Sequence, residues 1–128
     1  FEFAELVGVL IDKLQVPKLV SHSFGGVATT YSLSKYSHLK IEKYALFTTP
    51  NRFEDRINDV SKNVGLHEKV NIRLKQKLTK ELNLDLTKLS VTDFTQNISV
   101  KEALIVHDTF DISAQITVLF QGANDLLR

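Results

Sequence analysis

The sequence predicts an α/β fold, in which short apolar strands alternate with helices. Three runs of apolar residues have the length of buried strands, and segments with helical spacing of their apolar residues lie between them. This alternation is typical of a parallel sheet, because the return to a parallel strand needs a crossover that is usually helical. The chain has 128 residues, 43% of them hydrophobic and 24% charged, so we expect one globular domain at most.

The first part of the chain predicts a helix, a strand and a second helix. Apolar residues recur at helical steps in residues 2–15, which is typical of one face of an amphipathic helix. They are Phe3, Leu6, Val7, Leu10, Ile11 and Leu14. Pro17 ends this helix, and the partly β-branched run 18–22 indicates a short buried strand. A pair of glycines then allows a tight turn, and residues 27–36 have a helical pattern.

Two further strands and a polar helical interval follow. Residues 42–48 form a second apolar run, and residues 102–107 form a third. Between these runs, the interval 51–97 is rich in Lys, Asp, Glu and Asn, and its apolar residues have helical spacing. Ser90-Val-Thr-Asp93 begins a capped segment within it. We therefore expect this interval to form helices.

Composition excludes several function classes. The formal net charge is +1 and basic residues alternate with acidic ones, so the clustered basic surface that nucleic acids and anionic membranes require is missing. The absence of cysteine excludes disulfides, thiolate metal sites and a cysteine nucleophile. The apolar runs are far shorter than the roughly 20 residues that span a bilayer, and no signal-peptide pattern opens the chain. We expect a cytoplasmic protein with no nucleic-acid and no membrane partner.

We expect neither a metal site nor a cofactor. The His, Asp and Glu residues lack convincing ligand spacing, and the glycine pair lacks the further glycines or the lysine of a phosphate-binding loop. The chain also contains no methionine and begins at Phe1, inside the first predicted helix. We therefore expect a fragment of a longer chain, with its natural ends and oligomeric state open.

The most specific motif is Leu19-Val-Ser-His-Ser-Phe-Gly-Gly26, which places a serine between the first strand and the second helix. A serine at the apex of such a turn adopts a strained backbone, so the positions two before and two after it, Ser21 and Gly25, need small side chains. The turn lifts the Ser23 hydroxyl clear of the sheet, and the N–H of Phe24 points to where an oxyanion would form. The motif predicts Ser23 as a nucleophile and Phe24 N–H as an oxyanion donor.

With these residues the sequence resembles the α/β-hydrolase family, especially small esterase-like members with an Ala-His-Ser-x-Gly-Gly nucleophile elbow and a short helical cap. Ser21 stands where glycine or alanine is commoner in the family. The resemblance implies a partial α/β-hydrolase sheet, mostly parallel, with an inserted helical cap. It assigns residues 1–50 and 98–128 to an incomplete hydrolase core. Residues 51–97 become the cap over the active site.

The resemblance also implies a catalytic acid after a later strand. Ala103-Leu-Ile-Val-His-Asp-Thr-Phe-Asp111 resembles the family's apolar strand followed by His-Gly-x-x-Asp, so Asp111 is the preferred acid. Asp108, where the family often has glycine, is interpreted as a turn residue. The segment 116–125 also resembles a strand followed by Gly-x-x-Asp, which makes Asp125 the alternative acid. If that tail instead matches the family's last strand, Asp125 stands where the family has its histidine.

The family's catalytic base is missing from the pattern. In the family the histidine follows the acid, and no histidine follows His107. All four histidines are interpreted as structural: His22, His38, His67 and His107. The upstream loop that would supply a second oxyanion donor is also absent, and such a donor typically contributes about 2.7–4 kcal/mol. We expect this chain alone to be inactive or nearly so.

The function that the resemblance implies is that of a serine hydrolase acting on carboxylic esters or related acyl bonds of a small-molecule substrate. In a complete relative, Ser23 attacks the acyl carbon, a histidine held by Asp111 moves the proton, and Phe24 N–H binds the oxyanion. A non-catalytic, α/β-hydrolase-like protein that binds a small molecule is the alternative, and a structural domain without a site is a third. Apolar residues of the cap either line a pocket or pack the core, among them Phe53, Leu66 and Phe94.

Overall fold

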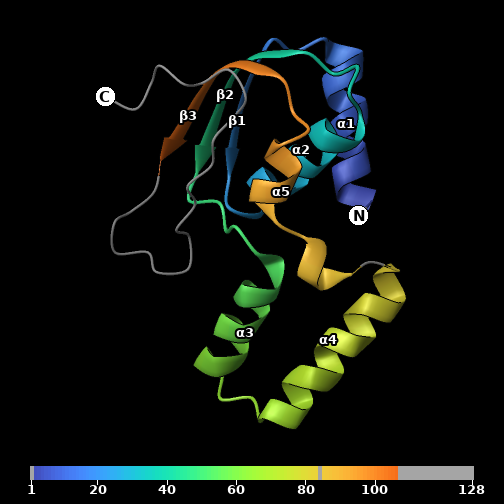
Figure 1. The fold of residues 1–128 in the computed structure, drawn as a ribbon, viewed down its shortest axis with the longest axis vertical. Coiled ribbons are helices and arrows are strands. Elements are labelled where there is room, and N and C mark those ends of the chain that lie inside the picture. The colour runs from blue at the N-terminus through green and yellow to red at the C-terminus, as the bar shows by residue number, and fades with distance from the viewer. Residues whose placement is uncertain (1, 84, 107–128) are drawn as a thin grey trace.

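A computed structural model of the chain describes residues 2–83 and 85–106. Its elements, shown in Figure 1, are α1 (Glu2–Leu14), β1 (Lys18–His22), α2 (Phe24–Lys35), β2 (Ile41–Phe47), α3 (Phe53–Asn63), α4 (Glu68–Leu82), a short 3₁₀ helix (Leu86–Lys88), α5 (Val91–Thr95) and β3 (Val100–Val106). The strands form a parallel sheet of three in the order β1-β2-β3. The predicted α/β class with a parallel sheet is therefore confirmed.

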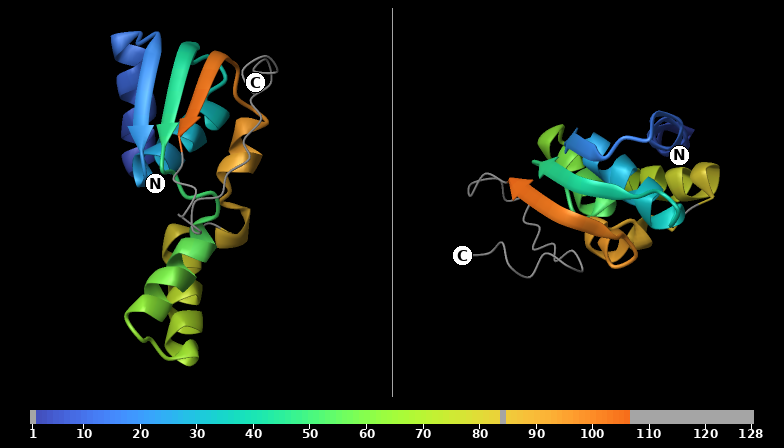
Figure 2. Two further views of the ribbon diagram at one scale, coloured as in Figure 1. Left: turned by 90° about the vertical axis from the view of Figure 1, so that its left-hand side faces the viewer. Right: turned by 90° about the horizontal axis from the view of Figure 1, so that it is seen from above.

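Helices cover one side of the sheet. Residues in register on that side are Leu19, Tyr44 and Ala103, and then Ser21, Leu46 and Ile105. Helices α1, α2 and α5 lie on this side (Figure 2), and each contributes to the hydrophobic core. On the other side, Val20 and Leu104 keep 74% and 57% of their surface exposed. Within the described part of the chain, the core therefore lies on a single side of the sheet.

Two small residues and one isoleucine form the packed face of α1. Ala4, Gly8 and Ile11 are buried beside α2, and a Cβ at Gly8 would lie 3.0 Å from the Tyr36 ring. The Ala4 carbonyl accepts a hydrogen bond from the buried Ser32 hydroxyl. The largest apolar residues of this helix are exposed instead: Phe3, Leu6, Leu10 and Leu14. The helix is amphipathic as predicted, but its close approach to α2 turns most of the apolar stripe outward.

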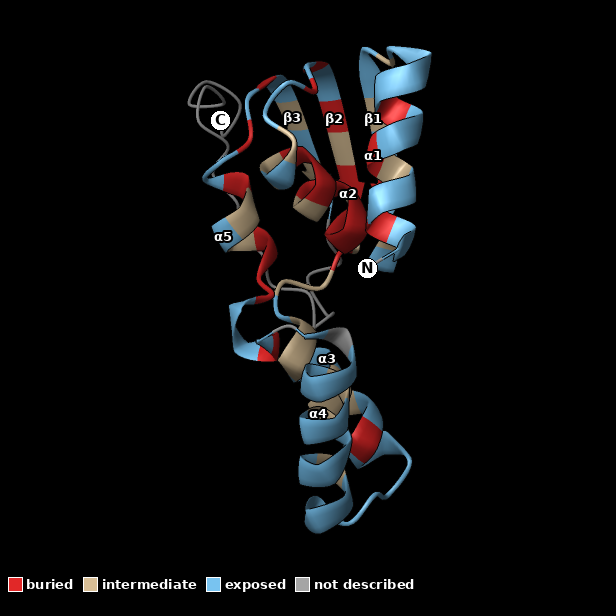
Figure 3. Cartoon of the chain, turned by 90° about the vertical axis from the view of Figure 1, so that its right-hand side faces the viewer, coloured by how far each residue is buried: buried red, intermediate tan, exposed pale blue. Residues whose placement is uncertain are grey.

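Helix α2 runs through the helical layer, and most of it is buried (Figure 3). Threonine has a modest helix propensity, yet Thr30 is fully buried here. Its hydroxyl donates to the Gly26 carbonyl one turn earlier, at 2.8 Å, which satisfies the polar group inside the core. The helix begins at Phe24 instead of at residue 27, because the preceding turn is completed by a single residue.

Helices α3 and α4 form a hairpin that extends away from the sheet (Figure 1). Polar contacts join the two helices. Lys75 Nζ lies 3.0 Å from Glu54 Oε1, and Asn71 Nδ2 donates to Asn58 Oδ1 at 3.0 Å. The predicted helical character of the interval 51–97 is confirmed over most of its length.

The segment after the hairpin returns to the sheet layer. Ser90 Oγ caps α5 by accepting from the Asp93 N–H at 3.4 Å, as the sequence predicts. The Phe94 ring packs edge-on against Tyr31 of α2, with 5.3 Å between ring centroids, so Phe94 belongs to the core. Leu66, in the connection between α3 and α4, is exposed. Among the described elements, only α3 and α4 project from the layer, and the boundaries assigned to the cap stay a prediction.

Candidate active site

The turn around Ser23 lies at the carboxyl edge of the sheet. Ser23 is the single residue between the end of β1 at His22 and the start of α2 at Phe24. Its N–H donates to the carbonyl of Phe47, the last residue of β2, at 2.9 Å, which ties the turn to the neighbouring strand. Ligands of open parallel sheets bind at the carboxyl ends of the strands. The predicted nucleophile is therefore at the edge where such proteins place their sites.

The backbone of Ser23 is strained. Its dihedral angles are φ 51° and ψ −126°, close to the first central position of a type II′ turn, which is normally occupied by glycine. Such a conformation costs a non-glycine residue about 1–3 kcal/mol. A second unusual residue ends the next strand, since the β-branched Thr48 has a φ of 45°. The sharp, strained turn that the motif requires is present.

The Ser23 hydroxyl takes no part in local hydrogen bonding. A serine that precedes a helix normally accepts a hydrogen bond from a backbone N–H of the first turn. Ser23 makes no such cap, and the Gly26 N–H donates to the Ser23 carbonyl instead, at 2.9 Å. Among the residues that the structure describes, no group hydrogen-bonds to Ser23 Oγ, and the side chain is only half-buried. The described part of the chain thus leaves the hydroxyl available to a bound molecule.

The N–H of Phe24 is the second polar group at the turn. It is the first amide of α2, one of those that a helix leaves without an intrahelical acceptor. Within residues 2–83 and 85–106 it has no hydrogen-bond acceptor. The partial positive charge at the amino end of a helix adds to its attraction for an anion. An oxyanion formed next to Ser23 would meet both the amide and this charge.

Beneath the turn, Ser21 anchors β1 to β2. Ser21 Oγ lies 2.7 Å from the Tyr44 hydroxyl, and both side chains are buried. From the sequence, Ser21 was expected to matter only because it is small. In the structure its hydroxyl also hydrogen-bonds with the buried Tyr44 phenol. Burial raises the pKa of Tyr44 to about 12, and hydrogen bonds with Ser21 and Thr29 oppose that rise. The phenol is neutral in the folded protein near pH 7 and has a structural role.

We expect the free energy of unfolding to fall at alkaline pH because of Tyr44. The folded pKa of about 12 lies above the ordinary 10.0, so the unfolded chain loses the phenolic proton first. Below pH 10 the buried, protonated phenol contributes about 2–3 kcal/mol to the free energy of unfolding. This contribution is lost as the pH rises to about 12. Urea unfolding between these pH values should show a steeper loss for the wild type than for Tyr44→Phe. Equal slopes would mean that the phenol is not buried.

The closest packing at the turn is between Gly26 and Thr49. A Cβ on Gly26 would lie 2.1 Å from Oγ1 and 2.8 Å from Cβ of the fully buried Thr49. A Cβ on Gly25 would meet no described atom within 4 Å beyond its own helix and chain neighbours. The motif assigned the need for a small residue to Gly25. The structure places the steric requirement on Gly26, which lets α2 approach the segment after β2.

Three phenylalanines gather beside Ser23 and form an aromatic cluster, defined as Phe3, Phe24 and Phe53. The Phe24 ring centroid lies 6.1 Å from that of Phe3 and 6.3 Å from that of Phe53. They come from the first turns of α1, α2 and α3. The sequence pointed to Phe53 and to the Phe24 amide, but it did not predict the cluster. Helical spacing gives no signal for contacts between three separate helices.

The predicted acids, Asp111 and Asp125, lie outside the described residues, as do Asp108 and His107. The last described strand, β3, ends at Val106, whose carbonyl accepts from the Thr48 N–H at 2.9 Å. Val106 therefore lies at the same sheet edge as Ser23. The choice between the two acids stays a prediction.

Two described histidines have partners away from Ser23. His38 Nε2 lies 3.6 Å from Asp12 Oδ1, and His67 Nδ1 accepts from the Lys69 N–H at 3.2 Å and so caps α4. The third, His22, is the last residue of β1 and is exposed. In the described ranges no histidine hydrogen-bonds to Ser23 Oγ.

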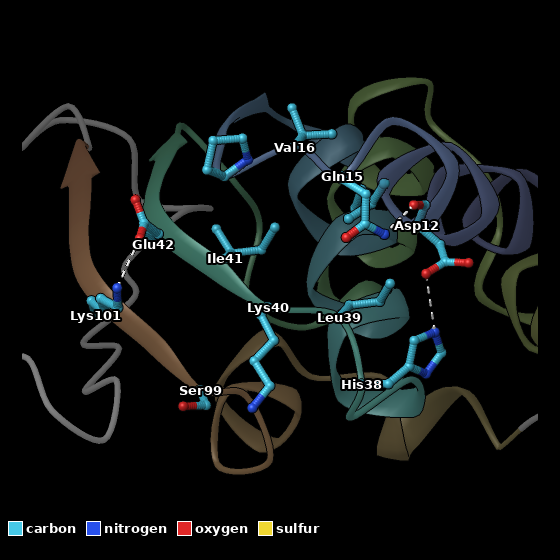
Figure 4. Close-up of a pocket in the computed structure, with 12 residues that line it drawn as sticks. Asp12, Gln15, Val16, His38, Leu39, Lys40, Ile41, Glu42, Ser99 and Lys101 are labelled. Atoms are coloured by element: carbon cyan, nitrogen blue, oxygen red, sulfur yellow. Dashed lines mark hydrogen bonds and ion pairs between the residues drawn. The ribbon is translucent and has the colours of Figure 1, made fainter.

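A pocket of about 360 Å³ lies at the opposite, amino-terminal edge of the sheet (Figure 4). Its lining includes Pro17, Lys40 and Ser99, each of which precedes a strand. An exposed ion pair borders it, with 2.7 Å between Lys101 Nζ and Glu42 Oε1. The pocket is at the far end of the strands from the turn, so it contributes nothing to the environment of the Ser23 hydroxyl.

Neither a metal-ligand cluster nor a membrane-spanning helix is found among the described residues. In that part of the chain, no three side chains of His, Cys, Asp or Glu are grouped so that they could hold a metal ion. None of the described helices is both long and apolar enough to cross a lipid bilayer.

No protein-family model, no curated protein and no solved structure matches the chain. The assignment of a site at Ser23 therefore rests on the geometry of the turn and on the chemistry of its residues.

Proposed function

We propose that the chain carries the nucleophile of a serine hydrolase of the α/β-hydrolase family, acting on carboxylic esters or related acyl bonds. The observation that carries the proposal is the state of Ser23, which combines a strained backbone with a hydroxyl that caps nothing. A serine with a purely structural role would use its hydroxyl on the helix and would avoid the strain. Strained residues concentrate at functional sites, so this combination favours a reactive role.

In this proposal Ser23 Oγ attacks the acyl carbon of an ester. The negative charge that develops on the carbonyl oxygen is stabilised by the Phe24 N–H and by the amino end of α2. A histidine takes the proton from Ser23 and passes it to the leaving alcohol, and Asp111, or alternatively Asp125, orients that histidine. The described residues supply the nucleophile and one oxyanion donor.

The proposal has a consequence for this chain by itself. A serine hydroxyl is a weak nucleophile unless an adjacent base accepts its proton. Since no described histidine contacts Ser23, we expect slow covalent capture of reactive phosphonates and little or no turnover of a generic acyl ester. Turnover that disappears in Ser23→Ala would contradict the expected inactivity but would support the hydrolase assignment.

Labelling with an alkyl fluorophosphonate tests the proposal. Intact-mass and peptide-mapping measurements should place the adduct on Ser23 and should find none in Ser23→Ala. Ser99→Ala is the matched control, because Ser99 is an exposed serine at the opposite edge of the sheet. It should be labelled like the wild type. An adduct spread equally over the exposed serines, or unchanged in Ser23→Ala, would contradict the proposal.

A non-catalytic protein that binds a small molecule is the second candidate. Two observations favour it: the aromatic cluster beside Ser23, in which Phe3 and Phe24 are exposed, and the absence of a histidine contact to Ser23 within the described residues. Binding of an apolar ligand without any labelling of Ser23 would select this candidate over the hydrolase.

A further inference from the structure

The aromatic cluster is placed as a substrate subsite would be. Each of its rings stands on the first turn of a helix, and Phe24 directly follows Ser23 in the chain. The rings of Phe3 and Phe24 are stacked, with 25° between their planes, and Phe53 is tilted by 50° against Phe24. The cluster therefore includes the residue that follows Ser23 and lies at the amino end of α2.

The cluster is also not needed to build the core. Phe3 and Phe24 keep 53% and 52% of their surface exposed, and none of the three rings belongs to the hydrophobic core cluster. Large aromatic side chains that gather at the surface without filling the interior are typical of ligand-binding or interaction sites. Next to them are the Ser23 hydroxyl and the Phe24 amide, which have no hydrogen-bond partner among the described residues. A molecule with both an apolar group and a polar, reactive group would fit this combination.

We propose that Phe3, Phe24 and Phe53 bind the apolar group of the substrate of Ser23, so that the preferred substrates are esters with a medium-length alkyl or an aryl group. This inference rests on the proposed function. Polar contacts at the turn hold the ester group, and the rings remove the alkyl or aryl group from water. The gain per buried methylene corresponds to about a fourfold increase in affinity.

The test compares ethyl and octyl fluorophosphonates on the complete chain. With half of the added methylenes in contact with the rings, the octyl probe should label Ser23 roughly 50-fold faster than the ethyl probe. Phe24→Ala should reduce that ratio by roughly 10-fold or more, because it removes the central ring. The matched control is Leu14→Ala, which removes an exposed apolar side chain at the other end of α1 and should leave the ratio unchanged.

Ligand binding to the Ser23→Ala variant tests the aromatic subsite without any reaction at Ser23. Titration with octanoate should shift the NMR signals of the three rings, and acetate at the same concentration should not. Shifts elsewhere, or none, would overturn the inference. Ring shifts that grow with protein concentration and without octanoate would mean that a second copy covers the cluster, which would also overturn it.

The two proposals fail in different ways. If Ser23 is labelled equally fast by both probes, or if the octyl preference survives in Phe24→Ala, the subsite is wrong and the hydrolase proposal stands. If neither probe labels Ser23 while octanoate still shifts the three rings, the hydrolase proposal is wrong and the apolar binding site stands.

Discussion

Replacing Gly26 by alanine is expected to lower the free energy of unfolding by about 1–3 kcal/mol, the usual effect of overpacking a core. The new Cβ would overlap the Oγ1, Cγ2 and Cβ atoms of Thr49, at 2.1, 2.6 and 2.8 Å. Rotation of the threonine moves the first two atoms but not its Cβ, and Thr49 is fully buried. The backbone of α2 must therefore shift, and this outweighs the better helix propensity of alanine, which is about 1 kcal/mol.

Gly25→Ala is the matched control, because it adds the same methyl group to the neighbouring position of the same helix. It meets no described atom within 4 Å beyond its own helix and chain neighbours, so urea unfolding should show no loss or a gain of about 0.4–1 kcal/mol. Thr49→Ala in the Gly26→Ala background should restore part of the stability, with a coupling energy measurable by a double-mutant cycle. Equal effects of the two glycine substitutions would contradict the described packing of α2 against Thr49.

The order of helices and strands could be predicted from the sequence because it depends on local patterns. The strand at Lys18–His22 was predicted at its observed limits, and Ser90 caps α5 as its spacing indicates. Periodicity could not say which face of α1 would be packed. The outcome depends on Ala4 and Gly8, whose small size lets two helices approach closely. Small residues carry little weight in a hydrophobic pattern.

The candidate site was only partly predictable. The spacing of Ser21, Ser23 and Gly25 indicated a strained turn, and the positive φ of Ser23 agrees with it. The pairing of Ser21 with Tyr44 joins two strands that are distant in the chain. The aromatic cluster likewise joins three helices. Such contacts follow from the register of the sheet and the packing of helices on it, which no local pattern contains.

The Ser23→Cys variant is expected to contain an unusually acidic thiol. A thiol at the amino end of a helix is stabilised as thiolate by the helix dipole and by unpaired N–H groups, which lowers its pKa by about one unit or more from about 8.5. At about pH 7 this means roughly 10-fold more thiolate. The native chain has no cysteine, so alkylation reports on this one position. The effect needs no catalytic base and therefore depends only on the geometry of the turn.

Ser37→Cys is the matched control, because Ser37 is exposed and lies just beyond the carboxyl end of the same helix. The dipole has the opposite sign there, so that thiol should have an ordinary or raised pKa. Circular dichroism of both variants confirms that α2 is intact before the comparison is made.

The pH dependence of iodoacetamide alkylation of Ser23→Cys, measured beside Ser37→Cys, tests most directly whether the turn presents a side chain at the amino end of α2. We expect complete alkylation of both variants, with the midpoint for Ser23→Cys lower by about one pH unit or more. A thiol at position 23 that resists alkylation in the folded protein, or one that titrates together with the thiol at position 37, would contradict the presented, strained geometry on which the assignment depends.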